Sequence, residues 1–518
     1  YQFIKYLREI SVIQKHIAIV GAGPGGLSSA IILANRGFKV SVYEKESEAG
    51  GRNAPIRIGD YTFDTGPTFL MMTFILEEIF LLAGKKLEDY LKIKKLDPMY
   101  RLVFDDKTVL PSDNKEKMKE TIKNIFPGNE NGYEKFLKRE RNKFEKMYPC
   151  LKIDYSSIFK FLHPNLLKAL PVMDLGKTLY GNLARYFSDE KLILSFTFQA
   201  KYLGMSAWEC PAAFTMIPYV EHHFGIYHVE GGLYKISSAM QKILEEKGGK
   251  IHFNTKVKSL ILEGKKTKGI ELENGEKIHA DEVIINADFA HAMSNLVPDG
   301  TLKKYSNKNL KKKKYSCSTF MMYLAVDKKY DIPHHNIFFA KDYKTNIENI
   351  FNNGKLTDEM SFYIQNASIT DSTLAPQGCS AIYILVPVPN NAFDIDWTKN
   401  KDIYREKVLK ELETRTELKD IRQHIKAEKI ITPSDWESNY AVYYGATFNL
   451  GHNLGQMLFF RPHNKFEELD NTYLVGGGTH PGSGLPTIYE SGRITSNMIS
   501  KKYGVKFEDV NILKDEKM

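Results

Sequence analysis

The stretch from His16 to Lys45 constrains the fold of this chain more than any other part of the sequence. It begins with a short β-branched apolar run at residues 17–20, which is typical of a buried strand. Gly21, Gly23 and Gly26 then form a G-x-G-x-x-G motif. A helix is predicted after the motif, and a second strand is predicted just before Glu44. The stretch therefore predicts a βαβ unit, the start of an α/β domain of the Rossmann type.

The residue types in this unit suit the binding of a dinucleotide. Gly21 allows a tight turn, Gly23 lets a pyrophosphate approach the backbone, and Gly26 lets the helix pack close to the strand. The N-terminus of the helix offers free N–H groups and a positive dipole end to phosphates. Glu44 can accept hydrogen bonds from a ribose diol. The alternative is a glycine-rich turn with Glu44 in solvent, and the strand–turn–helix–strand context favours dinucleotide binding.

Two motifs after the second strand indicate which dinucleotide is bound. Gly50-Gly51-Arg52 permits a close backbone approach, and Arg52 can offer a planar set of donors to a phosphate or a flavin edge. Asp64-Thr65-Gly66-Pro67 ends a short predicted strand at residues 61–64. An NAD enzyme would have no need of these segments. They resemble those of the flavin-dependent amine oxidase and carotenoid desaturase superfamily, which binds FAD.

A second signature lies near the C-terminus. A predicted strand at residues 473–475 runs into Gly476-Gly477-Gly478, followed by Thr479-His480-Pro481-Gly482 and by Ser483-Gly484-Leu485-Pro486. The glycines let the backbone lie against a flat ring. A helix predicted after Pro486 points its positive end back at that ring, which would stabilise a reduced, anionic flavin.

With this block in place, the chain resembles the bacterial-type phytoene desaturase family. That family includes the C30 diapophytoene desaturases and related carotenoid oxygenases. The N-terminal fingerprint, the two motifs after it, the V-E-G-G-L-Y segment at residues 229–234 and the C-terminal block match in order, so the resemblance covers nearly the whole chain. The Gly-Leu-Pro-Thr-Ile-Tyr-Glu-Ser end of the block is closer to the C30 and oxygenase branches than to the C40 branch, which leaves the length of the substrate open.

The resemblance implies non-covalent FAD, no metal, a long apolar polyene substrate, and peripheral association with a membrane surface. It also implies a set of FAD contacts, including the backbone of Val257 against the adenine. The expected contacts are Gly21, Ala22, Gly23, Pro24, Gly25, Gly26, Glu44, Lys45, Gly51, Arg52, Gly66, Pro67, Thr68, Val257, Asp288, Gly478, Thr479, Gly484, Leu485 and Pro486.

The expected architecture is α/β, with a Rossmann-type FAD-binding domain, a mixed α+β substrate domain that holds an antiparallel sheet, and an inserted helical cap. The FAD-binding domain is expected in three parts, at 15–98, 226–300 and 465–505. The helical cap is expected at 99–225, the substrate domain at 301–464, and a tail at 506–518.

The expected reaction is carotenoid desaturation, in which an allylic C–C bond loses a hydride to the flavin and a proton from the neighbouring carbon. The final electron acceptor would be oxygen or a quinone. Alternatives on the same fold are oxygenation of a terminal methyl group, a retinol saturase-like reduction, and isomerisation. A non-enzymatic alternative is a prenyl-lipid-binding escort protein for small GTPases, which shares the fold but lacks the T-H-P-G block.

No catalytic residue is assigned from the sequence. His480 lies in the flavin-facing motif with Glu490 just beyond it, and either could take the proton, although a structural role for His480 is favoured. The pairs His222-His223 and His334-His335 would point to opposite faces if they lay in strands, which disfavours a metal site.

Charge and cysteine content narrow the class further. The net charge of +9 is spread along the chain apart from Lys311–Lys314, which disfavours nucleic-acid binding; weak attraction to anionic lipid and plain solvation of the lysines remain the two interpretations. The four cysteines are far apart and form no C-x-x-C motif, which fits a reducing cytosol. The expected location is therefore cytoplasmic, at a membrane surface.

Two apolar stretches bear on membranes and substrate. No run reaches 18 apolar residues, and the segment before His16 has scattered charges unlike a signal peptide. A helix is predicted from Thr68 to Leu91 with a break at Gly84, rich in Phe, Leu, Ile and Met. It is either a core helix or the wall of an apolar substrate channel.

Overall fold

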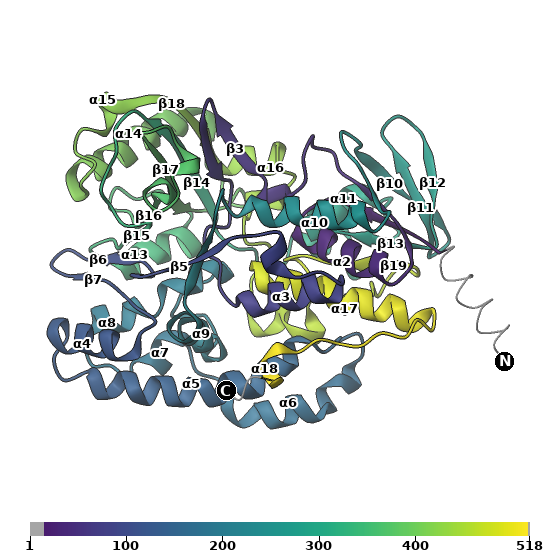
Figure 1. Ribbon diagram of the computed structural model, residues 1–518, viewed down its shortest axis with the longest axis horizontal. Helices are drawn as coiled ribbons and strands as arrows, with labels where there is room; N and C mark the ends of the chain where they lie inside the picture. Colours follow the sequence, from purple (N-terminus) through teal and green to yellow (C-terminus); the bar gives the residue numbers. More distant parts are fainter. Residues whose placement is uncertain (1–14, 516–518) are drawn as a thin grey trace.

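The computed structural model describes residues 15–515, so the segment before Lys15, on which the signal-peptide argument depends, lies outside the described residues. The molecule has three regions (Figure 1). The parallel sheet and its helices lie at the right, the large sheet lies at the upper left, and a layer of helices lies along the bottom. The expected α/β fold with an antiparallel second sheet is confirmed.

The first region is built on a five-stranded parallel sheet in the order β19-β13-β1-β2-β9. Alternate side chains of β1 face opposite sides of the sheet: Ile17 and Ile19 join one core cluster, and Ala18 and Val20 join another. All five strands are short, and the central residues of all but the edge strand β9 are buried, as expected for a parallel sheet covered on both faces. The strands are β1 (His16–Val20), β2 (Lys39–Tyr43), β9 (Lys250–His252), β13 (Glu282–Ile285) and β19 (Thr472–Leu474).

Helices cover one face of this sheet, and a small sheet with one helix covers the other. The central helix of the first face is α2, which packs between α10 and α17. The helices are α2 (Pro24–Asn35), α3 (Thr73–Leu82), α10 (Tyr234–Glu246) and α17 (Leu485–Lys502). The second face carries α11 (Phe289–Leu296) and the antiparallel strands β10 (Val257–Glu263), β11 (Lys266–Leu272) and β12 (Lys277–His279).

The second region is a seven-stranded sheet in the order β18-β14-β17-β16-β15-β6-β7. One face packs on α14 (Trp397–Arg415), where Met322 and Leu324 join the core cluster that contains Trp397. The other face is turned toward the interior of the molecule. The strands are β6 (Arg101–Val103), β7 (Thr108–Val109), β14 (Ser318–Val326), β15 (His335–Phe338), β16 (Phe362–Gln365), β17 (Ser380–Val388) and β18 (Ile425–Ile431).

The edge of this sheet contains a segment that we expected in the helical cap. Residues 101–109 form a hairpin, as their sequence predicts, but β6 pairs in parallel with β15 and so extends the large sheet. The sequence could not show this, because the pairing partner lies more than 200 residues away. Two two-stranded sheets complete the strands: β3 (Pro55–Ile58) with β4 (Tyr61–Asp64), and β5 (Ile93–Leu96) with β8 (Ile226–Val229).

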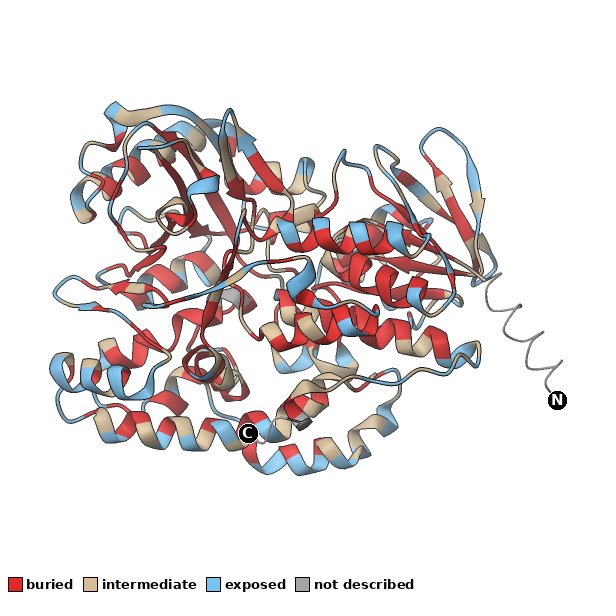
Figure 2. Ribbon diagram, in the orientation of Figure 1, coloured by how far each residue is buried: buried red, intermediate tan, exposed pale blue. Residues whose placement is uncertain are grey.

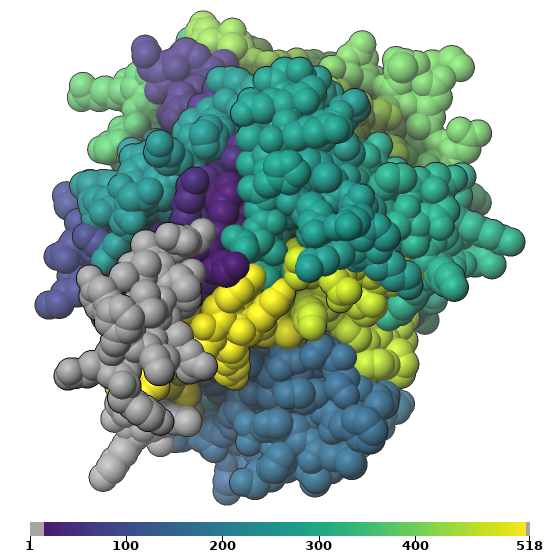
Figure 3. All heavy atoms as spheres, turned by 90° about the vertical axis from the view of Figure 1, so that its right-hand side faces the viewer, coloured from purple at the N-terminus to yellow at the C-terminus, as the bar shows by residue number. Residues whose placement is uncertain are grey.

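The third region is the layer of helices between residues 115 and 224. Its longest helix, α5, has a buried stripe and an exposed outer side, seen as alternating red and blue turns in Figure 2. In the side view of Figure 3 this region, drawn in blue, forms the lower end of the molecule, below the C-terminal part of the chain, drawn in yellow. The helices are α4 (Lys115–Ile125), α5 (Glu130–Leu151), α6 (Pro164–Ala169), α7 (Leu179–Leu183), α8 (Glu190–Ser195) and α9 (Met216–Phe224).

The helix expected over residues 68–91 is shorter than its sequence predicts. It begins at Thr73, because Met72 before it has a left-handed backbone (φ 51°), and it ends near Gly84 as expected. Leu70 instead forms a β-bridge with Tyr227. The histidines His222 and His223 also differ from the strand setting considered for them, since both lie in α9.

Candidate functional site

A large cavity of about 1860 Å³ lies where the three regions meet. Pockets for one drug-sized ligand are typically about 300–1,000 Å³, so this cavity has room for more than one such molecule. One end is lined by the glycine motifs of the first region. The other end is lined by apolar side chains of the cap helices and the large sheet. We call these the glycine end and the cap end.

The glycine end is built on the turn between β1 and α2. The Gly21 N–H donates to Tyr43 O at 2.8 Å, and the Asn286 side chain donates to Gly21 O at 3.0 Å. Gly23 is the N-cap of α2, with Pro24 in the first turn, so the free N–H groups of the helix face the cavity. A Cβ on Gly26 would lie 2.5 Å from Gly21 O, which shows the close helix–strand packing expected of the third glycine.

Glu44 ends β2 beside this turn. It is buried and accepts hydrogen bonds from the backbone N–H of Ala22 at 2.7 Å and of Glu46 at 3.0 Å. Burial raises the pKa of its carboxyl group, and the two N–H donors oppose that rise. Val257, at the start of β10, and Lys45 line the cavity near it.

The middle of the cavity holds a buried group of polar side chains. Arg52 donates to Thr447 O at 2.7 Å. The Asn449 amide lies between Arg52 Nη2 (3.1 Å) and Asp288 Oδ2 (2.6 Å). Burial raises the pKa of Asp288, and the nearby Arg52 guanidinium opposes the shift. Asp288 also caps α11 by accepting from the His291 N–H.

Three sequence motifs that lie far apart along the chain meet beside Arg52. Asp64 of the D-T-G-P motif accepts from the Leu233 N–H at 2.7 Å, and Asn53 donates to Leu233 O at 3.2 Å. Burial raises the pKa of Asp64 to about 6. Tyr323 and Tyr383 of the large sheet donate to Thr65 O and Gly66 O. The second region therefore holds this turn in position from the side opposite the parallel sheet.

The C-terminal block closes the middle of the cavity. Gly484 precedes α17 with φ 108°, and Leu485 and Pro486 in the first turn line the cavity, so the positive end of the helix faces it. The block is held from behind by Arg461, which is fully buried and donates to Gly477 O at 2.6 Å and to Thr479 O at 3.0 Å. No pattern in the sequence singled out Arg461, because its partners are backbone carbonyls.

Most of the residues expected to contact the cofactor line this one cavity. They are Gly21, Gly23, Pro24, Glu44, Lys45, Gly51, Arg52, Gly66, Pro67, Thr68, Val257, Asp288, Gly484, Leu485 and Pro486.

Ala22, Gly25, Gly26, Gly478 and Thr479 do not line it. Ala22 supports Glu44, a Cβ on Gly478 would meet Phe289 at 2.5 Å, and Thr479 donates its hydroxyl to Pro462 O. Gly476 and Gly477 line the cavity in place of Gly478.

His480 and Glu490 differ in their relation to the cavity. His480 lines it, but its Nε2 bonds to Leu151 O at 3.2 Å, and burial lowers its pKa to about 3. Glu490 is fully buried beside Arg493. Among residues 15–515, no group of three or more His, Cys, Asp or Glu side chains is arranged to hold a metal ion.

The cap end is largely apolar. Met321, Tyr363 and Tyr383 of the large sheet face it, and Phe69, Met71 and Met72 form another part of its wall. The helix α3 that follows Met72 does not line the cavity; Ile75, Ile79 and Phe80 are core residues. Lys201 also lines this end, where burial lowers its pKa to about 7, and it donates to Ser361 Oγ at 3.0 Å.

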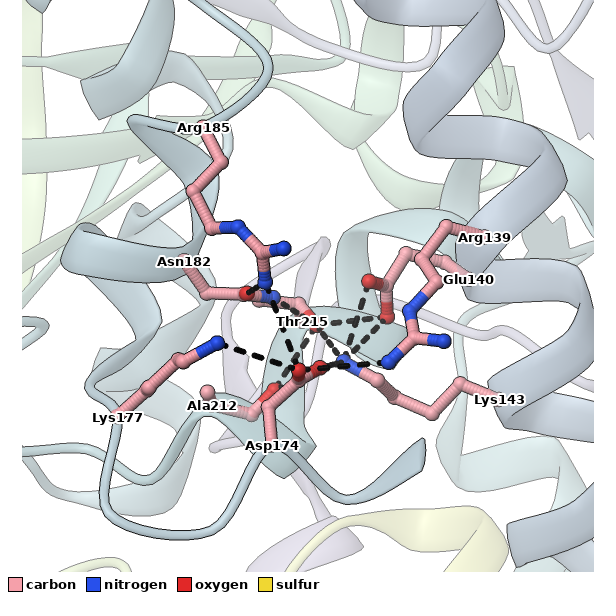
Figure 4. Close-up of polar contacts among 9 residues, drawn as sticks. All are labelled: Arg139, Glu140, Lys143, Asp174, Lys177, Asn182, Arg185, Ala212 and Thr215. Atoms are coloured by element: carbon pink, nitrogen blue, oxygen red, sulfur yellow. Dashed lines mark hydrogen bonds and ion pairs between the residues drawn. The ribbon is translucent and has the colours of Figure 1, made fainter. Parts of the chain in front are cut away.

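Residues 173–178, which we call the wall loop, close part of the cap end. Asp174 in this loop lies 3.0 Å from Lys143 Nζ, and Lys143 is fully buried in α5 (Figure 4). Lys143 also contacts Glu140 at 3.0 Å, donates to Thr215 Oγ1 at 2.6 Å and donates to Ala212 O at 3.1 Å. Arg139, Lys177 and Arg185 surround Asp174 at 3.4–3.9 Å. The Asp174–Lys143 contact thus ties the wall loop to α5.

Comparison with known proteins identifies the class of the protein. Residues 24–500 match the family described as flavin containing amine oxidoreductase. The chain is 56% identical to a 4,4'-diapophytoene desaturase (4,4'-diapolycopene-forming) from Methylomonas sp., over 96% of this chain and 97% of that protein. It is 34% identical to an all-trans-zeta-carotene desaturase from Myxococcus xanthus, over 95% of this chain and 94% of that protein.

Solved structures agree on the fold. An oxidoreductase from Methanosarcina mazei has a TM-score of 0.60 at 18% identity and covers 93% of this chain and 100% of its own. A Rab GDI from Plasmodium falciparum has a TM-score of 0.53 at 12% identity, with 96% and 100% covered, and so shares the fold alone. The protein is a flavin-dependent oxidoreductase. The chain belongs to the flavin containing amine oxidoreductase family and, within it, to the carotenoid desaturases.

Proposed function

We propose that this carotenoid desaturase uses FAD to desaturate a C30 polyene of the diapophytoene type. The observation that carries the proposal is one large cavity with two unlike ends: a glycine-lined, polar end suited to a dinucleotide, and an apolar end suited to a hydrocarbon. The 56% identity to a diapophytoene desaturase supports the C30 substrate over a C40 one.

The residues present fit FAD. Gly23 lines the cavity where the pyrophosphate is expected, and a Cβ on it would meet Asn286 Nδ2 at 2.9 Å, so only glycine fits this part of the turn. Thr447 lines the middle of the cavity, and its buried hydroxyl has no hydrogen-bond partner in the described chain, so it can bind a polar edge of the ring system. Bound flavin supplies the acceptor for the hydride. Oxygen or a quinone would then take the two electrons from the reduced flavin.

The protein's own contribution is orientation and the exclusion of water. Phe69, Met321, Tyr363 and Tyr383 give the cap end walls that align an apolar chain and keep water from a cationic polyene. Arg52, Asp288 and Asn449 hold one another in a fixed arrangement beside the first turn of α17. The first turn of α17 lines the cavity, and its dipole would favour negative charge on a flavin ring held beside it.

The route for substrate is a surface patch on the cap. Six large apolar side chains are exposed there, with Phe159 at 77% and Leu162 at 68% exposure. We call this the cap patch; it comprises Ile158, Phe159, Leu162, Leu167, Leu170 and Leu175. Phe161 and Leu166, beside the cap patch in sequence, line the cavity, as do Leu170 and Leu175 themselves. Lys160 and Lys168 alternate with these residues.

This combination of exposed apolar residues and lysines is what binds the surface of an anionic bilayer. No helix within residues 15–515 is long and apolar enough to cross a membrane. We therefore include peripheral association through the cap patch in the proposal, with the polyene passing from lipid into the cap end.

Pigment extraction tests the proposal. The chain is expressed in cells that accumulate either the C30 or the C40 colourless precursor, and the extracts are analysed by absorbance and mass. We expect new visible bands with the C30 precursor and masses lower by two hydrogens for each double bond. Bands with the C40 precursor alone would overturn the substrate length. A gain of oxygen without a loss of hydrogen would assign an oxygenase instead.

A further inference from the structure

A cluster of buried histidines lies behind the cap end of the cavity, and no step described so far uses it. His228 comes from β8, His335 is the first residue of β15, and His334 precedes it. Their exposures are 2%, 6% and 0%. The ring of His334 lies between the other two, with centroids 4.4 Å from His335 and 4.8 Å from His228. Imidazoles rarely gather in a dry interior without a role, because each must find hydrogen-bond partners.

One end of the cluster reaches the cavity wall. The Tyr363 hydroxyl lies 2.7 Å from His335 Nδ1 and 3.0 Å from Thr68 Oγ1. Tyr363 and Thr68 both line the cavity. Phe69, also in the wall, stacks on the His335 ring at 4.2 Å and fixes its plane. The phenol is therefore the polar atom through which the cavity contacts the histidines.

The other end of the cluster reaches the surface. His228 Nε2 lies 2.9 Å from Asp371 Oδ2, and Asp371 Oδ1 accepts from the Thr373 hydroxyl at 2.6 Å. Ser372 and Thr373 are exposed. Asp371 thus connects a buried imidazole to side chains in contact with water.

Two ring nitrogens in the middle of the cluster are unpaired in the described chain: His335 Nε2 and His228 Nδ1. An unpaired buried polar atom destabilises the fold, so such atoms are normally matched with a hydrogen-bond partner. A buried water needs two to four polar partners, and these two nitrogens, in the rings on either side of His334, are the partners that the relay below assigns to one.

The protonation states suit proton transfer. Burial lowers the pKa values of His334 and His335 well below the ordinary value, so both rings are neutral near pH 7. A neutral imidazole has one donor and one acceptor and can pass a proton through itself. Burial opposes ionisation of Asp371, but hydrogen bonds from His228, Thr373 and Gly231 outweigh it and hold the pKa well below the ordinary value.

We propose that Tyr363, His335, His228 and Asp371 form a proton exit from the cap end to solvent. The inference rests on the proposed function. Desaturation removes a hydride, which the flavin accepts, and then a proton, whose C–H electron pair becomes the second bond of the alkene. The Tyr363 oxygen accepts that proton as Tyr363 passes its own to His335 Nδ1. His335 Nε2 releases a proton through the water to His228 Nδ1, and His228 Nε2 releases one to Asp371 and the solvent.

The test separates the proton step from the hydride step. Tyr363→Phe and His335→Gln are compared with wild type in anaerobic single turnovers, using whichever polyene wild type desaturates. Flavin absorbance follows hydride transfer, and polyene absorbance follows the finished alkene. We expect the finished alkene to form about 10²-fold more slowly in both variants, which is the usual size of a general-base effect. Deuterium at the carbon that loses the proton should slow formation of the alkene further.

The matched control is His222→Gln, because His222 is a buried histidine of the cap that stacks on Phe196 and does not line the cavity. It should leave the alkene step unchanged. A second readout needs no turnover. The ¹⁵N shifts of the His335 and His228 rings should both change in Tyr363→Phe, because the two rings share one hydrogen-bonded chain.

If the wild-type protein desaturated none of the polyenes, the proposed function would be overturned. The ¹⁵N shifts would still test whether Tyr363, His335 and His228 form one chain of contacts. Equal alkene rates in wild type and both variants would overturn the proton exit. An NMR response confined to His335 would overturn its continuation to His228.

Discussion

At the glycine end of the cavity the chain presents backbone, whereas at the cap end it presents side chains. Gly21 and Gly23 bring N–H groups and carbonyls to the cavity surface, and a single added carbon on either of them, or on the nearby Gly26, would collide with neighbouring atoms. The wall loop at the cap end is held instead by charges, with Lys143 buried among Glu140, Asp174 and Thr215. The first arrangement fits one rigid ligand closely, whereas the second holds the wall through contacts between side chains.

The largest effect is expected at the glycine end. Gly26→Ala places a Cβ 2.5 Å from Gly21 O and about 3.0 Å from Asn286 Cβ, so the turn must open. We expect purified protein to lose essentially all bound flavin, measured by absorbance after denaturation. Gly455→Ala is the control at the cap end, where the added Cβ meets Asn453 at an ordinary 3.7 Å. Full flavin content in Gly26→Ala would contradict the account.

The next effect concerns the buried ions of the cap end. Lys143→Met leaves Glu140 and Asp174 without their buried cation. Removing one partner of a buried ion pair typically costs about 3–5 kcal/mol. We expect a drop of that size in the free energy of unfolding from urea titration. Lys177→Met is the control, since Lys177 is 49% exposed and 3.9 Å from Asp174, and should cost under about 1 kcal/mol.

A pH-dependent effect is expected at Glu221 in α9. Its carboxyl group is fully buried, and burial raises its pKa to about 7, while Gln199 and Tyr100 donate to it. The folded state therefore holds a proton that the unfolded state releases above about pH 4.3, so this group lowers stability as pH rises to 7. Glu221→Gln should raise the melting temperature at pH 8 and leave it nearly unchanged at pH 4. An equal shift at both pH values would contradict this.

The smallest effect on the folded protein is expected at the cap patch. Phe159→Glu with Leu162→Glu should leave the melting temperature unchanged, because both side chains are exposed. Burial of one large apolar side chain in lipid contributes about 1.5–3 kcal/mol, so binding to anionic vesicles should weaken tenfold or more. Ile403→Glu is the control, at 57% exposure on α14. Sedimentation with vesicles measures binding, and equal loss in the control would exclude a specific patch.

The two ends also differ in how far the sequence predicts them. The glycine end follows from fixed spacings, because a β–turn–α unit places Gly21, Gly23 and Glu44 together through local geometry. The same reasoning does not tell which glycines of the C-terminal turn line the cavity: Gly476 and Gly477 do, whereas Gly478 lies against Phe289 and Thr479 donates to Pro462 O.

The cap end could not be predicted from spacing. In the sequence, Lys143 is one of many lysines in an amphipathic helix. Its partners Asp174 and Thr215 are distant in the sequence and lie beside it only in the folded chain. The histidine cluster is similar: His228 and His335 are more than 100 residues apart in the sequence, and the fold places both of their rings against His334. In the same way, β6 joined the large sheet through a partner that no local pattern indicated.

The central claim is that one cavity holds flavin at the glycine end and a C30 polyene at the cap end. The most direct test is an anaerobic titration of the flavin-loaded protein with diapophytoene in liposomes, followed by absorbance. The account predicts that one flavin is reduced for each double bond formed, with new polyene bands appearing in step. Polyene bands without loss of oxidised flavin, or no reaction with a fully loaded protein, would contradict it.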